Sequence, residues 1–156
     1  MKKLKTFFLI LGLISLSVIA SCGGGGDDTP DLTPEEQRLV DLAGTTGVTW
    51  KAVSVTFDGA PANGLDNFSV TFRGNATSKT YNSVDGDPFL GASGTWNFVG
   101  TNINQITFDN NTDNVYNLSL NTSSSPSVLT MTVNYTSDGG TRAGASGTYV
   151  FTLQQQ

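Results

Sequence analysis

Few residues of this chain could carry out acid–base or nucleophilic chemistry. The 156-residue sequence has no histidine, which removes the usual general base near neutral pH and the commonest zinc ligand. Its only cysteine is Cys22, and its only glutamates, Glu35 and Glu36, lie where a helix is expected to begin. Most aspartates fall in turn-like segments, and no glycine-rich phosphate loop is present. We therefore expect a protein that is not an enzyme, with no catalytic residues and no cofactor.

One segment has the spacing of a calcium loop. Asp109-Asn110-Asn111-Thr112-Asp113-Asn114 places oxygen-bearing side chains at its first, third and fifth positions. However, Asn114 occupies the sixth position, where a calcium loop needs glycine, and Leu120 the twelfth, where a bidentate glutamate is needed. Aspartate and asparagine are also ordinary residues of tight turns. We interpret the segment as a turn and predict no metal site.

The remaining candidates are apolar side chains that could line a ligand cavity. Seven lie in strand-like segments: Trp50, Phe68, Phe72, Trp96, Phe98, Met131 and Tyr149. An eight-stranded barrel either fills its interior with side chains or holds one small ligand. These residues are therefore candidate ligand contacts, with membership of the core as the more common alternative for any one of them.

The amino terminus is typical of an exported lipoprotein. Three lysines in the first five residues precede an apolar run, residues 7–20, that is shorter than the roughly 20 residues of a membrane-spanning helix. Ile19-Ala20-Ser21-Cys22 follows and resembles the bacterial lipobox. The resemblance implies that residues 1–21 are a signal peptide and that Cys22 carries the lipid. The alternatives are a retained membrane anchor and a free thiol.

Residues 22–32 are predicted to be a lipidated flexible tether, because residues 23–26 are all glycine. The acidic pair Asp27-Asp28 resembles the export signal of Bacteroidetes surface lipoproteins. This implies a lipid anchor in the outer membrane, on the cell surface or, if the pair only solvates the linker, on the periplasmic face. Without the signal the chain has five basic and 13 acidic residues, a net charge of −8. A nucleic-acid partner needs a basic face and is not expected.

Residues 33–156 are expected to form one domain that begins with a short helix. Thr33 can cap the helix, Pro34 suits its first position, Glu36 completes a capping box, and Gly44 can end it. From Val48 onward, apolar and polar residues alternate as in half-buried strands. Eight strands are predicted near residues 48–58, 66–73, 78–83, 93–99, 103–109, 114–120, 127–136 and 146–154.

Short connections between these strands favour antiparallel pairing of neighbours, so the domain is all-β, either an up-and-down barrel or a sandwich. On the first strand, Trp50 and Val53 have opposite parity, which a bulge near Lys51-Ala52 would reconcile. Trp96 and Phe98 share a parity and should both face the core.

Several short motifs resemble the lipocalin-like domains of Bacteroidetes outer-membrane lipoproteins. They are Leu42-Ala43-Gly44-Thr45, Trp50-Lys51-Ala52-Val53, Asp58-Gly59, residues 68–74, Tyr81, Gly94-Thr95-Trp96-Asn97-Phe98 and Gly147-Thr148-Tyr149-Val150-Phe151. One position departs from the lipocalin pattern, since Val48 stands two residues before Trp50 where lipocalins have glycine. The resemblance implies an eight-stranded antiparallel up-and-down barrel.

Two functions follow from these observations. The first is a binding protein that holds a small apolar or amphipathic ligand in the barrel; an interior filled with side chains would count against it. The second is a surface-exposed structural or interaction protein that contacts glycan or protein through its outer face and loops. An exposed row of aromatics such as Tyr81, Tyr116 and Tyr135 would favour the second, because sugar rings stack on such platforms.

Overall fold

The computed structural model describes residues 31–137 and 145–156. The predicted signal peptide, the lipid-bearing Cys22 and the tether up to residue 30 lie outside the described residues. Residues 31–156 make up one unit with its own core, so we expect them to fold without the preceding segment. Within the described part of the chain, no helix has the length and apolar character that crossing a membrane requires.

Helix α1, Pro34–Ala43, begins and ends where the local sequence predicts. Thr33 Oγ1 accepts a hydrogen bond from the Glu36 backbone N–H at 3.2 Å. The Glu36 carboxylate in turn accepts one from the Thr33 N–H at 2.8 Å, which completes the capping box. Gly44 follows the helix with a φ of 58°, a conformation that favours glycine. The predicted helix and both of its ends are confirmed.

The capping box gives the stability of the domain a pH dependence. Hydrogen bonds from the Thr33 backbone and hydroxyl lower the pKa of Glu36 below its usual 4.5. A carboxylate with a lowered folded-state pKa stabilises the fold at neutral pH and loses that contribution as the pH falls below 4.5. Glu36→Gln should therefore lower the Tm at pH 7, and the difference from wild type should shrink at about pH 3. Thermal melts at the two pH values test this; a difference that stays the same at both would contradict it.

Nine strands follow the helix. They are β1 (Val48–Phe57), β2 (Ala60–Pro61), β3 (Ser69–Gly74), β4 (Lys79–Val84), β5 (Ser93–Val99), β6 (Asn102–Phe108), β7 (Tyr116–Asn121), β8 (Val128–Tyr135) and β9 (Gly147–Gln155). All except β2 correspond to the eight predicted strands. The prediction missed β2, which forms a tight hairpin with β1 through Asp58 (φ 47°) and Gly59 (φ 84°).

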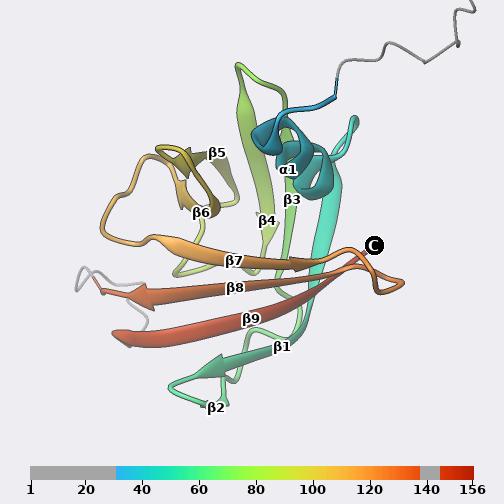
Figure 1. The fold of residues 1–156 in the computed structure, drawn as a ribbon. Helices are drawn as coiled ribbons and strands as arrows, with labels where there is room; N and C mark the ends of the chain where they lie inside the picture. The colour runs from blue at the N-terminus through green and yellow to red at the C-terminus, as the bar shows by residue number, and fades with distance from the viewer. Residues whose placement is uncertain (1–30, 138–144) are drawn as a thin grey trace, which may run out of the picture. The chain divides into compact units, whose positions relative to one another are not determined.

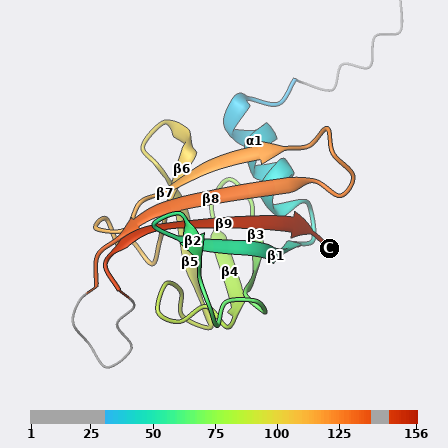
Figure 2. The same ribbon diagram turned by 90° about the horizontal axis from the view of Figure 1, so that it is seen from below.

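Pairing between β1 and β9 closes the sheet into a barrel. β1 pairs with β3, and each later strand pairs antiparallel with the next one along the chain. The seam between β1 and β9 runs from Trp50 opposite Gln155 to Phe57 opposite Tyr149. Figures 1 and 2 both show β7, β8, β9 and β1 side by side. The predicted eight-stranded antiparallel up-and-down barrel is confirmed, and the choice between barrel and sandwich is settled in favour of the barrel.

A bulge in β1 resolves the parity conflict on this strand. The β1–β9 register shifts between Ala52 and Ser54, so Val53 is the extra residue. Trp50 before the bulge and Val55 after it are both buried, whereas Val53 is 59% exposed. The predicted bulge is thus present one residue further along, and it turns Val53 outward instead of inward.

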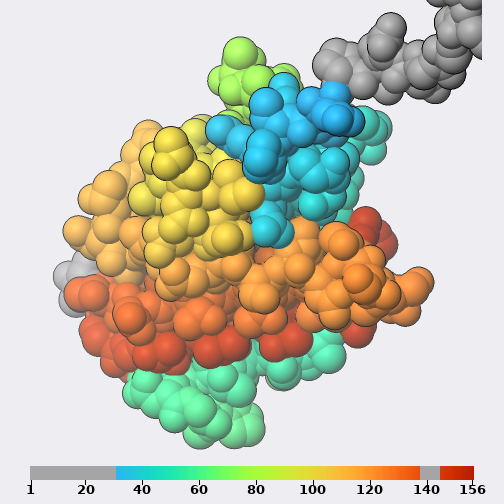
Figure 3. All heavy atoms as spheres, in the orientation of Figure 1, coloured from blue at the N-terminus to red at the C-terminus, as the bar shows by residue number. Residues whose placement is uncertain are grey.

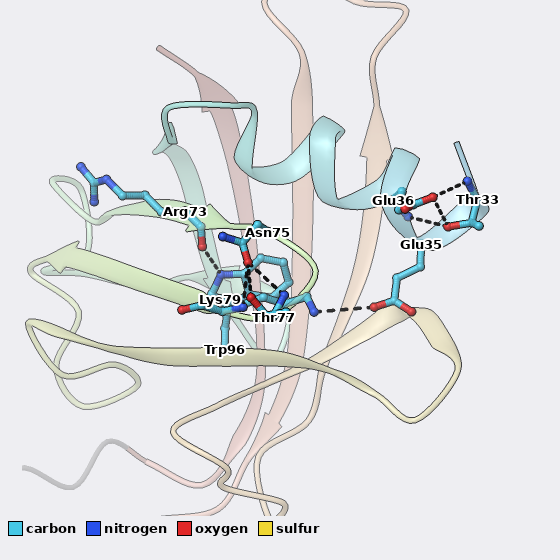
Figure 4. A network of polar contacts seen from close by, with 9 residues as sticks. Thr33, Glu35, Glu36, Arg73, Asn75, Thr77, Lys79 and Trp96 are labelled. Atoms are coloured by element: carbon cyan, nitrogen blue, oxygen red, sulfur yellow. Dashed lines mark hydrogen bonds and ion pairs between the residues drawn. The ribbon is translucent and has the colours of Figure 1, made fainter. Parts of the chain in front are cut away.

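Helix α1 packs on one end of the barrel, where β1 and β6 begin and β3 ends; we call this the α1 end. The indole N–H of Trp50 donates a hydrogen bond to the Leu42 carbonyl at 2.9 Å. Lys79 Nζ lies 3.6 Å from the Glu35 carboxylate, as Figure 4 shows. Figure 3 shows the helix seated beside the β5–β6 hairpin.

The core fills the barrel between its two ends. Its largest fully buried side chains are Trp50, Trp96, Tyr81, Tyr116, Phe68, Phe72, Phe151, Leu42, Ile106, Leu129, Met131 and Leu153. Aromatic pairs link neighbouring strands across it, such as Phe72 and Trp96 with ring centroids 5.2 Å apart. The Trp96 indole N–H also finds an acceptor, the Arg73 carbonyl at 3.2 Å (Figure 4). Burial of this aromatic core is the main stabilising contribution to the fold.

Candidate binding site

Most of the predicted ligand-lining residues belong to the core. Trp50, Phe68, Phe72, Trp96 and Met131 have no exposed surface. They pack as part of one cluster of buried side chains that runs through the barrel. A ligand could contact these five residues only by displacing the side chains around them. The structure thus gives them the role of core residues, which was the alternative open at the sequence level.

The other two predicted residues lie toward opposite ends of the barrel. Phe98 is half-buried near the α1 end, packs edge-on against Trp96 at 5.3 Å, and has Lys79 Nζ 5.6 Å from its ring centroid. Tyr149, near the start of β9, lines a groove at the other end. This second end, where β1, β4, β6 and β8 finish, is called the mouth below. Tyr149 is therefore the predicted contact that the structure places on the wall of a groove.

The groove at the mouth has a volume of about 440 Å³. It is lined by residues 60–65 and 87–89 together with Phe57 and Tyr149. Alanine, proline, leucine and aromatic side chains make up most of this lining. Burial raises the pKa of Tyr149, so its phenol remains neutral at physiological pH. Binding pockets for small molecules are concave and mostly apolar, and they begin at about 300 Å³, which this groove exceeds.

Phe89 reaches the groove from the connection between β4 and β5. Its backbone N–H donates to the Gly86 carbonyl at 2.8 Å, and the connection is closed further by Ser83 Oγ, which donates to the Gly91 carbonyl at 2.7 Å. The Phe89 ring meets Tyr149 at 4.5 Å between centroids and Tyr135 at 4.9 Å, both edge-on. These contacts place Phe89 between the groove and the aromatic core.

Phe57 forms the opposite side of the groove, because its ring lies over the backbone of Gly147. A Cβ atom at Gly147 would collide with the Phe57 ring, so glycine is required there. Phe57 also packs on Tyr149 with ring centroids 4.7 Å apart. The turn after Phe57 is fixed to β9, since the Asp58 carboxylate accepts a hydrogen bond from the Thr148 N–H at 2.9 Å.

A second, acidic hollow of about 400 Å³ adjoins the groove. Residues 85–87 and 90–92 line it, with Gly64 and Ser83. Gly64 and Asp87 line both hollows, so the two are neighbours at the mouth. The combined site therefore has an aromatic part and a part that carries the carboxylates of Asp85 and Asp87.

The aspartate that begins the calcium-like segment is engaged in hydrogen bonds within the protein. Asp109 accepts hydrogen bonds from the Tyr81 hydroxyl at 2.7 Å and from the Thr95 N–H at 2.8 Å. Burial, and then this hydrogen bond to Asp109, raise the pKa of Tyr81 above its usual 10.0. Asp109 and Asn110 both have positive φ values, as expected of a tight turn. Among the described residues, no three or more histidine, cysteine, aspartate or glutamate side chains gather into a metal site.

The three tyrosines that could have formed a sugar-stacking row are buried. Tyr81 is 1%, Tyr116 2% and Tyr135 7% exposed. Burial also raises the pKa of Tyr116 above its usual 10.0. These tyrosines therefore cannot act as an aromatic platform on the outer face.

Phe57 and Phe89 are site residues that the sequence analysis missed. Phe89 follows Asp85-Gly86-Asp87-Pro88, a segment read only as a turn. The available signal was a phenylalanine and a leucine directly after that polar turn, since apolar residues in a connection need a partner to cover them. Phe57 ends its strand immediately before the Asp58-Gly59 turn, which places it at the rim of any barrel built from that strand.

No protein-family model, characterised protein or solved structure matches this chain. A barrel alone does not indicate an activity, because one fold serves many unrelated functions. The chemistry of the mouth is therefore the basis on which a function can be assigned.

Proposed function

We propose that this protein is a lipid-anchored, non-catalytic protein of the outer membrane whose lipocalin-like barrel binds a small apolar or amphipathic ligand at its mouth. The single observation that carries the binding proposal is the apolar groove between Phe57, Phe89 and Tyr149. The ligand binds above the core instead of within it, because the interior is occupied by side chains. The anchor rests on the lipobox-like segment that ends at Cys22.

The groove can be tested with a neutral apolar fluorophore such as N-phenyl-1-naphthylamine and the chain without its signal, residues 23–156. Binding should raise the fluorescence of the probe in a saturable way. Ala60→Trp places a large ring in the groove and should weaken binding about tenfold or more. Thr45→Trp, at an exposed position that does not line the groove, is the matched control and should bind like wild type. Saturable binding that neither substitution alters would place the ligand elsewhere; absence of binding would refute the proposal.

The anchor predicts a covalent lipid on Cys22. Cells grown with labelled palmitate should incorporate the label into wild-type protein and not into the Cys22→Ala variant. Each buried CH₂ contributes about 0.8 kcal/mol to membrane affinity, so two or three acyl chains hold the protein firmly. Mass spectrometry of the amino-terminal peptide gives the independent readout, and a wild-type peptide with an unmodified cysteine would contradict the prediction.

The alternative function, a surface-exposed structural or interaction protein, has less support. Its expected platform of exposed tyrosines is buried in the barrel. The large apolar side chains exposed on the strands are Val53 and Val84, and neither offers a flat ring to a sugar. The tether and the acidic pair Asp27-Asp28 are equally compatible with both functions.

A further inference from the structure

The mouth presents an apolar surface and an acidic surface side by side. The groove and the acidic hollow share Gly64 and Asp87, so a ligand that fills the first can extend into the second. Asp85 and Asp87 both line the acidic hollow. Among the described residues, no lysine or arginine lines either hollow.

The basic side chains of the described residues are placed away from these two hollows. Arg38 lies on α1 and donates to Asn104, and Lys79 pairs with Glu35 at the same end. Arg73 donates to Asn82 on the neighbouring strand, and Lys51 is exposed on β1. The electrostatic potential at the mouth is therefore dominated by carboxylates, within a chain whose net charge is already −5.

From this arrangement we propose that the mouth selects ligands with an apolar body and a cationic ammonium head. The apolar body lies against Phe57, Phe89 and Tyr149, and the head lies in the hollow beside Asp85 and Asp87. An anionic head, such as a carboxylate or a phosphate, would be repelled from the same hollow. This inference rests on the proposed function and adds the chemical class of the ligand.

Charge complementarity should give a preference of moderate size, because the hollow is open to solvent. Exposed ion pairs contribute little individually, so two carboxylates should favour an ammonium head over a neutral one about three- to tenfold. The preference should shrink when the salt concentration is raised from about 20 mM to about 500 mM, since mobile ions screen exposed charges. Binding of the apolar body should change little over this range.

Three probes with the same tail test the proposal: octylamine, octanol and octanoate, each titrated into residues 23–156 at pH 7 by calorimetry. The expected order of affinity is octylamine, then octanol, then octanoate. Asp85→Asn combined with Asp87→Asn should remove the advantage of octylamine and leave octanol binding unchanged. Asparagine is the suitable replacement because Asp85 has a φ of 49°, which asparagine tolerates. The pair Asp31→Asn and Asp113→Asn removes two charges at exposed positions that line neither hollow, and should preserve the order.

The outcomes separate the two proposals. Octanol that binds while octylamine shows no advantage overturns the charge preference and leaves the apolar groove standing. Octanoate as the tightest ligand overturns the charge preference as well. Failure of all three probes, together with failure of the neutral fluorophore, overturns both the groove and the preference. Loss of the octylamine advantage in the control pair would assign it to overall charge instead of to Asp85 and Asp87.

Discussion

Trp50→Ala is expected to destabilise the domain by about 3–5 kcal/mol, the usual cost of deleting a large buried aromatic side chain. Trp50 is fully buried near the α1 end of the barrel, and its indole N–H donates to the Leu42 carbonyl in the last turn of α1. The substitution therefore opens a cavity in the core and also leaves a helix carbonyl without its hydrogen-bond donor. Few other single side chains join the helix to the barrel in both ways.

Two further variants separate these effects. Trp50→Phe keeps much of the ring and removes the donor, so it should cost less, about 1–3 kcal/mol, and should speed hydrogen exchange in α1. Val53→Ala, on the same strand at an exposed position, should stay within about 0.5 kcal/mol of wild type. Urea unfolding of residues 23–156, followed by circular dichroism, gives all three values. A Trp50→Ala variant within 1 kcal/mol or so of wild type would show that the helix and barrel do not depend on this residue.

Gly94→Ala should also be strongly destabilising, by about 1–3 kcal/mol or more. The Asp109 carboxylate lies directly over Gly94, and a Cβ atom there would collide with it. The carboxylate is held in that place by hydrogen bonds from Tyr81 and Thr95. The added methyl group must therefore either shift β5 or break these hydrogen bonds.

A double-mutant cycle identifies the collision as the cause. Asp109→Gly removes the carboxylate, and glycine suits the φ of 51° at this position. In that background Gly94→Ala should cost much less than in wild type. Gly91→Ala is the matched control, because a Cβ atom there would meet its neighbours at 3.7 Å, an ordinary contact. Equal costs of Gly94→Ala in both backgrounds would assign the requirement for glycine to something other than Asp109.

Local patterns in the sequence were sufficient for the elements of this fold. The capping box of Thr33 and Glu36 depends on atoms within three residues of each other, so it could be predicted without any knowledge of the rest of the chain. Strand positions followed from the alternation of apolar and polar residues, and the Asp58-Gly59 turn from the backbone conformations that these residues tolerate. The alternation also identified most of the core, including Trp50, Phe72 and Trp96.

Contacts between distant segments settled the rest. The β1–β9 seam joins residues about a hundred positions apart, and the choice between a barrel and a sandwich depended on it. Alternation indicates which residues share a face of a strand but not which face turns inward, and tyrosine suits either face. Tyr81 and Tyr116 could therefore be assigned to the interior only once the barrel had closed around them. Phe89 belongs to no strand, and its place at the mouth follows from rings on β8 and β9 that only the folded chain brings within reach.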